Sequence, residues 1–485
     1  MEAPGTGPFS LSEIFNISLS QSQRLLALSV GAPLIPHRLV GEQRVSEPFR
    51  YTLDCFSQQG DIELKSLMAQ PARLSVLQAD GDYRYFHGLV SEAAMLGEDG
   101  GVTYYQITLV PWLDMLKLGR NSRIFQNRSA VDVLSEVFDG HDLARGGYRF
   151  DLRRDYPARS YCVQYRESDF QFVSRLMEEE GLWYYFEHSG NGRVEDGEEA
   201  KGREENSFDG HRLVITDDVD TCQPVQPRTI RFHRQAATEQ EDALTQWGGV
   251  RQQQPTRVSV GTFDYKQPSL TKRTGLSTLT DQGNLPDAEV YDYAGEYYYY
   301  GHDRGERLTA NRLEAFESDA KRFRGAGGVR QLEAGRWFEL SQHPRHDTGG
   351  EAERQFLILG VTVHAENALP VSAHLYALPG SLIPRIDAAK RAHGLDDNQS
   401  ESTNNYQHTG TGHFLMTLDA QRRTQPYRSP LLHKRPVLGG PQTATVVGPE
   451  GEEIHTDHLN RVRVQFHWDR QGRHNEQAGV GLRDP

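Results

Sequence analysis

Hydrophobic and polar positions alternate with a period of two in a series of short segments between residues 48 and 110. Turn-forming residues separate one segment from the next. The segments are PFRYTLDCF (48–56), ARLSVLQ (72–78), YRYFHGLV (83–90) and TYYQITLV (103–110). This spacing predicts an antiparallel β-barrel or sandwich rather than alternating β-α-β units.

Three other segments place their apolar residues at helical spacing. The first helix is predicted to begin after Ser129, which can cap it, and to end at Gly140. The second is predicted to begin at Ser168, whose spacing from Gln171 is that of a capping box, and to end at Gly181. The third spans about residues 306–323, before Gly325. The apolar faces are Val133, Leu134, Val137 and Phe138 in the first helix, Phe170, Val173, Leu176 and Met177 in the second, and Leu313, Phe316, Ala320 and Phe323 in the third.

The second helix is followed directly by the predicted strand LWYYFEH (182–188). We therefore expect Phe170, Val173 and Leu176 to hold this helix against a β-sheet that includes Trp183. Their predicted role is packing rather than chemistry.

A strong strand pattern also lies near the end of the chain, in RVRVQFHW (461–468). Val462, Val464, Phe466 and Trp468 share one face, and Arg461, Arg463, Gln465 and His467 share the other. If the apolar face lies inside a barrel, it needs neighbouring strands, which we expect at Thr443–Val447 and Glu452–Thr456. We expect His467 to lie on a solvated or interfacial face.

Two polar stretches interrupt the chain. Residues 189–210 are predicted to form a solvated loop and residues 391–412 a linker, and the length of 485 residues is typical of about three domains. The tyrosine cluster EYYYY (296–300) is predicted to be a strand with a wet face or a subunit contact, although it could also be a stacking platform.

Composition and charge narrow the choice of function. Lys and Arg total 53 against 67 Asp and Glu, a net charge of −14 that disfavours nucleic acid as a partner. The first residues, MEAPGTGPFS, lack the pattern of a cleaved signal peptide. The three cysteines, Cys55, Cys162 and Cys222, form neither a CxxC motif nor an even-numbered disulfide framework. We expect assembly in a reducing cytosol.

The sequence offers no recognisable catalytic motif. GxSxG, GxxxxGK[ST], a GxGxxG after a strand and HExxH are all missing. The carboxylates of EEEG (178–181) and GPEGEE (448–453) are expected at a solvated helix end and a charged turn. His343 with His346, and His455 with His458, have HxxH spacing, but two histidines supply only half of a metal site. We therefore assign no catalytic, cofactor-binding or metal residue, and expect no cofactor.

Three segments resemble, in order, the VgrG spike proteins of bacterial type VI secretion systems, a family related to the hub and spike of contractile phage tails. They are TYYQITLVPWLDMLKLGRNSRIFQNRSAVDVLSEVF (103–138), YRESDFQFVSRLMEEEGLWYYFEH (165–188) and VVGPEGEEIHTDHLNRVRVQFHWDR (446–470). Weaker similarity in VRQLEAGRWFELSQHP (329–344) extends the resemblance over nearly the whole chain.

The resemblance implies a mainly β fold with some α+β structure. It implies an N-terminal segment (1–24), a first hub β-barrel (25–118), an α+β segment (119–210), a second hub β-barrel (211–385), a linker (386–430) and a partial OB-fold (431–485). After WDRQGRHNEQ the sequence departs from the family pattern, and the β-helical needle expected next is absent from the 485 residues.

The function implied is a non-enzymatic structural hub that forms a homotrimer, caps the hexameric Hcp tube and delivers effectors. Further implied partners are baseplate proteins, effector or adaptor proteins and, only with the needle present, a PAAR tip. The resemblance also implies assembly in the bacterial cytoplasm and injection without a signal peptide. Two alternatives stay open: the hub of a phage tail or tailocin, and a baseplate hub with wall-degrading activity, although no region leaves room for a catalytic domain.

Overall fold

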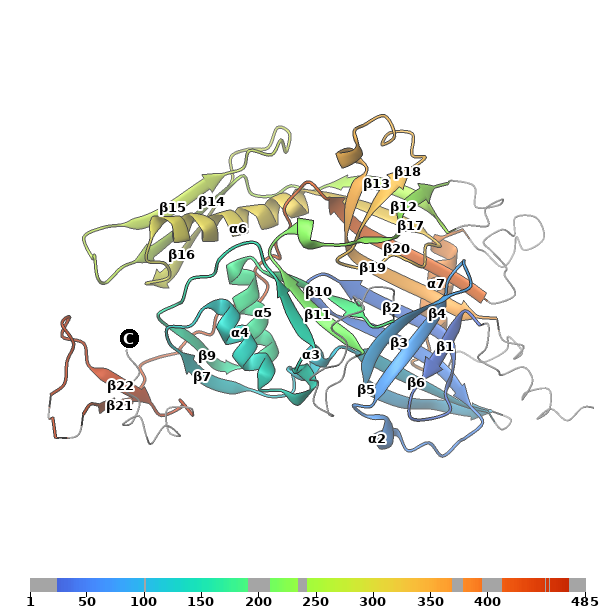
Figure 1. Cartoon of the computed structure of the whole chain (residues 1–485), viewed down its shortest axis with the longest axis horizontal. Coiled ribbons are helices and arrows are strands. Elements are labelled where there is room, and N and C mark those ends of the chain that lie inside the picture. Colours follow the sequence, from blue (N-terminus) through green and yellow to red (C-terminus); the bar gives the residue numbers. More distant parts are fainter. Residues whose placement is uncertain are drawn as a thin grey trace, which may run out of the picture.

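The computed structural model describes residues 24–99, 102–190, 210–233, 242–368, 378–394, 412–449, 451–452 and 454–470. Two barrel-like units built from a single twelve-stranded sheet dominate the fold. They lie next to one another in Figure 1, while a helix with a three-stranded sheet extends to one side and the last two strands stand apart. The predicted fold class, mainly β with some α+β, is confirmed.

The first unit contains six strands in the order β1-β4-β5-β6-β3-β2. Their bounds are β1 (Leu26–Ser29), β2 (Ile35–Arg44), β3 (Glu47–Ser57), β4 (Pro71–Leu77), β5 (Tyr83–Asp99) and β6 (Val102–Val110), with the short helix α2 (Leu64–Leu67) before β4. Buried leucines, valines and aromatic residues from alternate positions fill its interior, as the period-two pattern predicts.

The second unit is a closed barrel of six strands, because its last strand returns to pair with its first. The order is β19-β18-β12-β13-β17-β20, and β20 also pairs with β19. The bounds are β12 (Pro224–Phe232), β13 (Ala243–Arg251), β17 (Lys321–Gly327), β18 (Trp337–Ser341), β19 (Gln355–Asn367) and β20 (Gly412–Arg422).

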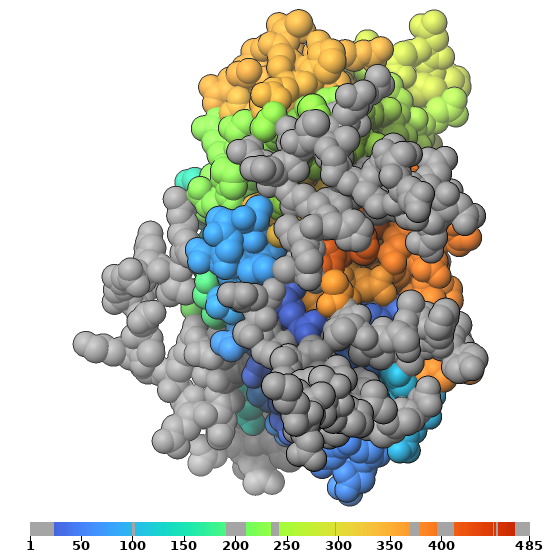
Figure 2. All heavy atoms as spheres, turned by 90° about the vertical axis from the view of Figure 1, so that its right-hand side faces the viewer, coloured from blue at the N-terminus to red at the C-terminus, as the bar shows by residue number. Residues whose placement is uncertain are grey.

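Strand β19 joins the two units, because its second half pairs with β2 from Gly360↔Arg44 to Glu366↔Arg38. Figure 2 shows the first unit in blue beside the orange strands of the second unit on the face it presents. At the end of β19, the Asn367 amide nitrogen donates to the backbone oxygens of Leu26 (2.9 Å) and Pro36 (2.7 Å), and its oxygen accepts from the Leu26 N–H (2.8 Å). This side chain bridges β1 and β2, which do not pair directly.

The expected linker at 386–430 is wrong in two places. Strand β20 lies inside this range and closes the second barrel, and α7 (Ile383–Ala392) packs its Ile386 beside Val40 of β2. The polar composition of the residues before β20 favours a linker. Strand β20 forms because it pairs with β17 and β19, which are distant in sequence. Similarly, residues 211–216, expected in the second barrel, form β11 and pair with β10 of the α+β segment.

The α+β segment contains two small sheets, the helices α4 and α5, and shorter helical turns. The sheets are β7 with β9 and β10-β11-β8. The bounds are α3 (Trp112–Met115), β7 (Asn121–Phe125), α4 (Ala130–Asp139), β8 (Tyr148–Asp151), β9 (Cys162–Glu167), α5 (Asp169–Glu180), β10 (Trp183–His188) and β11 (His211–Thr216), with one-turn helices η1 (Asp142–Ala144) and η2 (Val219–Thr221).

The first two predicted helices are confirmed as α4 and α5. Ser129 caps α4 in a capping box with Asp132, and the four predicted apolar residues are buried. Ser168 accepts a hydrogen bond from the Gln171 N–H, and Gly181 ends α5 with a φ of 74°. A side chain at Gly181 would also collide with Asn311, so glycine suits this position for two reasons.

The predicted packing of α5 is confirmed, because Val173 and Leu176 are fully buried and the partly buried Phe170 packs against the same core, which includes Tyr184 and Phe186 of the strand that contains Trp183. Phe170 is only half-buried, and the buried aromatic residue is Phe172, whose ring stacks on Phe125 at 5.6 Å. Trp183 belongs to a different cluster, because alternate residues of β10 point to opposite sides of the strand. Tyr184 and Phe186 share the core cluster of α5.

The third helix, α6 (His302–Ala320), covers a three-stranded sheet of order β15-β14-β16. These strands are β14 (Arg257–Phe263), β15 (Lys272–Ser277) and β16 (Glu289–Glu296). Val258 and Val260 pack with Leu308 and Leu313 in a small core. The helix ends before Phe323, contrary to expectation, because Phe323 lies on β17 inside the second barrel.

The terminal strands form a two-stranded ladder, β21 (Ala444–Val447) with β22 (Arg463–Phe466). The predicted pairing with Thr443–Val447 is confirmed, but near Thr456 only a single bridge to Val462 forms. Val462 and Val464 are 52% and 43% exposed, so the expected burial of this face is wrong for both valines. Phe466 and Trp468 instead stack on one another at 5.0 Å, and Trp468 contacts Tyr165.

Candidate functional site

The histidine pairs singled out by their spacing do not form metal sites. His343 is buried beside Phe232, and the Trp247 indole N–H donates to His346 Nε2 at 3.1 Å. Burial, followed by the Arg422 charge, lowers the pKa of His346 to about 4, so this imidazole is neutral near pH 7. His455 contacts Glu452 at 2.7 Å, and His458 is exposed. Among the described residues, no group of three His, Cys, Asp or Glu side chains could hold a metal ion.

The three cysteines are all free and buried. Burial raises the pKa of the Cys222 thiol to about 12 and also raises the pKa values of Cys55 and Cys162. The thiols are therefore protonated at neutral pH and are poor nucleophiles. Of the helices that the structure describes, none is long and apolar enough to cross a membrane.

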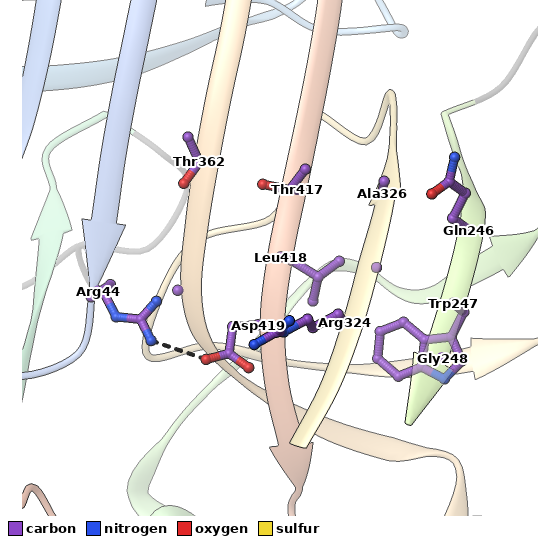
Figure 3. A pocket seen from close by; sticks show the side chains of 12 residues that line it. Arg44, Gln246, Trp247, Gly248, Arg324, Ala326, Thr362, Thr417, Leu418 and Asp419 are labelled. Carbon is purple, nitrogen blue, oxygen red and sulfur yellow. Dashed lines mark hydrogen bonds and ion pairs between the residues drawn. The ribbon is translucent and has the colours of Figure 1, made fainter. Parts of the chain in front are cut away.

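A hollow of about 600 Å³ lies on the outer wall of the second barrel, and we call it the barrel-wall trough. Figure 3 shows its lining side chains, which come from β2, β13, β17, β19 and β20. Strand register places Thr362, Thr417, Ala326 and Gln246 in one row across four strands. A second row contains Gly360, Asp419, Arg324 and Gly248.

The trough is on the outside of the barrel because the alternate residues fill the inside. Trp247 stacks on Phe323 at 5.6 Å and contacts Phe356 at 4.7 Å, and Leu418 belongs to the same core. On the trough side, Arg44 Nη2 pairs with Asp419 Oδ2 at 3.0 Å. The floor of small residues, with hydroxyl and amide groups around it, can receive an element of another protein at close range.

Sequence reasoning missed this trough. The polar positions of HFLMTLDAQR, with Thr417 and Asp419 two apart, are the signal that β20 has an outward polar face. That signal does not reveal which other strands lie beside it.

A second feature is a buried cluster at the C-terminal end of α5, which we call the arginine–glutamate cluster. Glu178, Glu179 and Glu180 are 7%, 6% and 3% exposed. The predicted solvated helix end is therefore wrong. The partners of these three carboxylates are His433 and the arginines Arg159, Arg175, Arg304, Arg307 and Arg435.

The pairs of the cluster connect distant parts of the chain. Glu180 accepts from Arg159 Nε (2.9 Å) and from Arg304 Nη1 of α6 (2.7 Å). Glu179 accepts from Arg435 Nε (2.6 Å), in the arm that follows β20. Burial would raise the pKa of Glu180, but Arg159 and Arg304 lower it below its usual value overall. Glu180 is therefore ionised, and the ion pairs of Glu180 and Glu179 tie α6 and the arm to α5.

Neither feature has the geometry of an active site. The residues that line the trough include no nucleophile with an adjacent base, and in the cluster Glu179 and Glu180 pair with arginines while Glu178 pairs with His433. What these features can do is hold polypeptide segments together, within the chain in the cluster and between chains in the trough.

Comparisons with known proteins point to one class of assembly. The sequence profile of the phage tail baseplate hub (GPD) family matches residues 42–369. The type VI secretion system spike proteins VgrG1b and VgrG1c of Pseudomonas aeruginosa are each 32% identical to this chain, over 96% and 97% of its length. The chain spans 56% and 57% of these two relatives.

Two solved structures share the fold. One is the Escherichia coli c3393 protein, described as a type VI secretion component with structural similarity to the T4 tail proteins gp27 and gp5. Its TM-score is 0.59 at 18% identity, covering 91% of this chain and 89% of that one. The other is a tail protein from Neisseria meningitidis, with a TM-score of 0.52 at 10% identity, covering 83% of this chain and 99% of that one.

Proposed function

The chain belongs to the phage tail baseplate hub family, and from this premise we propose that it is a non-enzymatic hub of a type VI secretion spike. The observation that carries the proposal is the 32% identity to spike proteins, which extends over 96% of the chain rather than over one domain. The relatives are named as structural spike proteins, which supports a structural role here.

We propose further that three copies form a ring that caps the Hcp tube. Each chain contributes two barrel-like units, so three chains present six units to a hexameric tube. The pairing of β2 with β19 supports this idea, because a continuous ladder holds the two units at a fixed spacing. The barrel-wall trough is our candidate for a contact between neighbouring chains.

The remaining partners are proposed on the same basis. They are baseplate proteins, effector or adaptor proteins and, where a needle follows the OB-fold, a PAAR tip. We propose assembly in the bacterial cytoplasm followed by injection into a target cell. The three buried thiols support folding in a reducing compartment.

The test is the molar mass in solution, measured by light scattering on the purified chain with and without Hcp. We expect three times the chain mass, and a larger complex when Hcp is added. Thr417→Arg should reduce the trimer fraction, because a long cation would fill the trough, and the exposed Thr280→Arg is the matched control.

A monomer in all conditions, including with Hcp, would contradict the proposal. Binding to a phage tail tube protein in place of Hcp would assign the chain to a phage tail. Release of fragments from purified peptidoglycan would instead favour the wall-degrading alternative.

A further inference from the structure

A second hollow, of about 600 Å³, borders the arginine–glutamate cluster and is separate from the barrel-wall trough. It lies among the segment that precedes and begins β9, the chain that follows β16, and the arm that leads to β21 and β22. We call it the tyrosine groove. Its volume is in the range typical of sites that bind small molecules or short peptide segments.

The charged residues that line the tyrosine groove are all cationic. They are Arg159, Arg175, Lys266, Arg304, Arg435 and Arg461. No Asp or Glu is among the lining residues, although the chain as a whole carries a net charge of −14. The charged side chains at the surface of the groove are therefore all cationic, on a protein whose net charge is negative.

Five of these cations form ion pairs with carboxylates that do not line the groove. Arg159, Arg304 and Arg435 belong to the arginine–glutamate cluster, Arg175 pairs with Glu167 at 2.8 Å, and Arg461 pairs with Asp457. The ion pairs fix their orientation without placing a carboxylate in the groove. Their remaining N–H groups are donors of fixed direction.

Lys266 differs from the other five, because none of the ion pairs between described residues includes it. Its ammonium lies 5.0 Å from the ring centre of Tyr297 and 5.9 Å from that of Tyr265. The side chain is exposed, so its charge is available to a partner. Two aromatic faces favour this charge without neutralising it.

Tyrosine side chains form much of the remaining lining of the tyrosine groove. The predicted strand at 296–300 is wrong beyond Glu296, where Tyr297 turns the chain with a φ of 49°. Tyr161, Tyr265 and Tyr300 are 48%, 40% and 52% exposed. Burial raises the pKa of Tyr161 and of Tyr298, so both phenols stay neutral and can donate.

One acceptor in the groove lacks a partner. The side-chain oxygen of Gln126 is buried and makes no hydrogen bond. A phosphate or sulfate without a hydrogen-bond donor cannot satisfy it, whereas a backbone N–H can.

We propose that the tyrosine groove binds an extended, carboxylate-rich segment of a partner protein. Its acidic side chains pair with Lys266 and the fixed guanidinium groups, and its apolar side chains lie on the exposed tyrosine rings. The proposal concerns a surface separate from the barrel-wall trough and does not depend on trimer formation.

The experiment uses the whole chain and two fluorescein-labelled peptides, EFEEFE and its lysine counterpart KFKKFK, with binding followed by fluorescence anisotropy. We expect the glutamate peptide to bind and the lysine peptide not to bind. Lys266→Glu should weaken binding of the glutamate peptide about tenfold, because it replaces an attraction with a repulsion. The matched control is Lys65→Glu, at a lysine that is 87% exposed on α2.

A second variant, Tyr161→Ala, tests the aromatic wall and should also weaken binding. Equal affinity of Lys266→Glu and Lys65→Glu, binding of both peptides, or full competition by millimolar inorganic phosphate would each overturn the proposal. A change in the light-scattering mass of Lys266→Glu would show that a second copy of the chain occupies the groove, which also overturns it. Unaltered melting temperatures establish that the variants are folded.

Discussion

At the scale of single residues, a few buried rings decide how the α+β segment is held. Phe172 is fully buried, its ring lies parallel to Phe125 within 11°, and the Arg175 guanidinium lies over it at 5.4 Å. Phe170 lies two residues away on the same helix but is only half-buried, between Lys117 and His433. Because Phe170 and Phe172 differ in burial, the same Phe→Ala substitution at each position tests how burial of the ring affects stability.

Phe172→Ala should lower the free energy of unfolding by about 3–5 kcal/mol, because it removes a buried ring and leaves a cavity. Phe170→Ala should cost roughly half as much, because part of the ring is already in water. Urea denaturation of both variants measures the difference. Equal losses would mean that Phe170 is buried as deeply as Phe172.

Buried histidines give the chain an acid sensitivity. His188 accepts from the His87 N–H and His211 accepts from the Trp112 N–H, both inside the core. Burial lowers the pKa of both imidazoles well below their ordinary value. Below about pH 6.5 the unfolded chain therefore binds protons that the folded chain does not, so stability falls as the pH falls.

Between pH 7 and pH 5, the free energy of unfolding of the parent chain should fall by roughly 2 kcal/mol more than that of His188→Gln. The measurement is the free energy of unfolding in urea at each pH. His458→Gln, at an exposed position, is the matched control for the substitution itself. An unchanged slope in His188→Gln would show that His188 is protonated in the folded chain.

At the scale of elements, the arginine–glutamate cluster fastens α6 and the C-terminal arm to the end of α5. Glu179 is buried and contacts three guanidinium groups, those of Arg159, Arg175 and Arg435. Removal of one member of such a cluster is costly, because the other members stay buried without compensation.

Glu179→Gln should destabilise the chain by about 3–5 kcal/mol and speed hydrogen exchange of the backbone amides at 427–435. Glu136→Gln, at an exposed glutamate on the adjacent helix α4, is the matched control and should change neither quantity. If exchange in the arm is unaffected while stability falls, the cluster stabilises α5 but does not hold the arm.

At the scale of the whole molecule, the two barrel units form one continuous body, while β21 and β22 form an isolated pair. The first unit and the closed barrel share β19, whereas β22 has a single hydrogen-bonded neighbour strand. A two-stranded ladder with exposed valines has little burial to stabilise it.

In the isolated monomer, we expect the amides of residues 463–466 to exchange faster than those of β6, which lies between β3 and β5. In a trimer or a Hcp complex, exchange at 463–466 should slow if other chains cover the open edges. Hydrogen exchange with mass spectrometry reads both regions in one experiment. Equal protection in the monomer would contradict this expectation.

The sequence by itself determined the local elements. Ser129, Ser168 and Gly181 set the ends of α4 and α5, and alternating residues set the strands of the first unit, because capping and side-chain periodicity depend on neighbours within a few positions. The resemblance to spike proteins, carried by three motifs, also identified the family before the fold was known.

Only the tertiary structure decided which side chains meet. Glu178–Glu180 have the composition of a solvated helix end, yet arginines from as far away as residue 435 bury them. Val462 and Val464 have the pattern of an interior face, yet both stay exposed although Val446 pairs with Val464 and Thr456 bridges to Val462. Burial depends on partners that the chain brings from more than a hundred residues away, and a local pattern contains no information about which partners arrive.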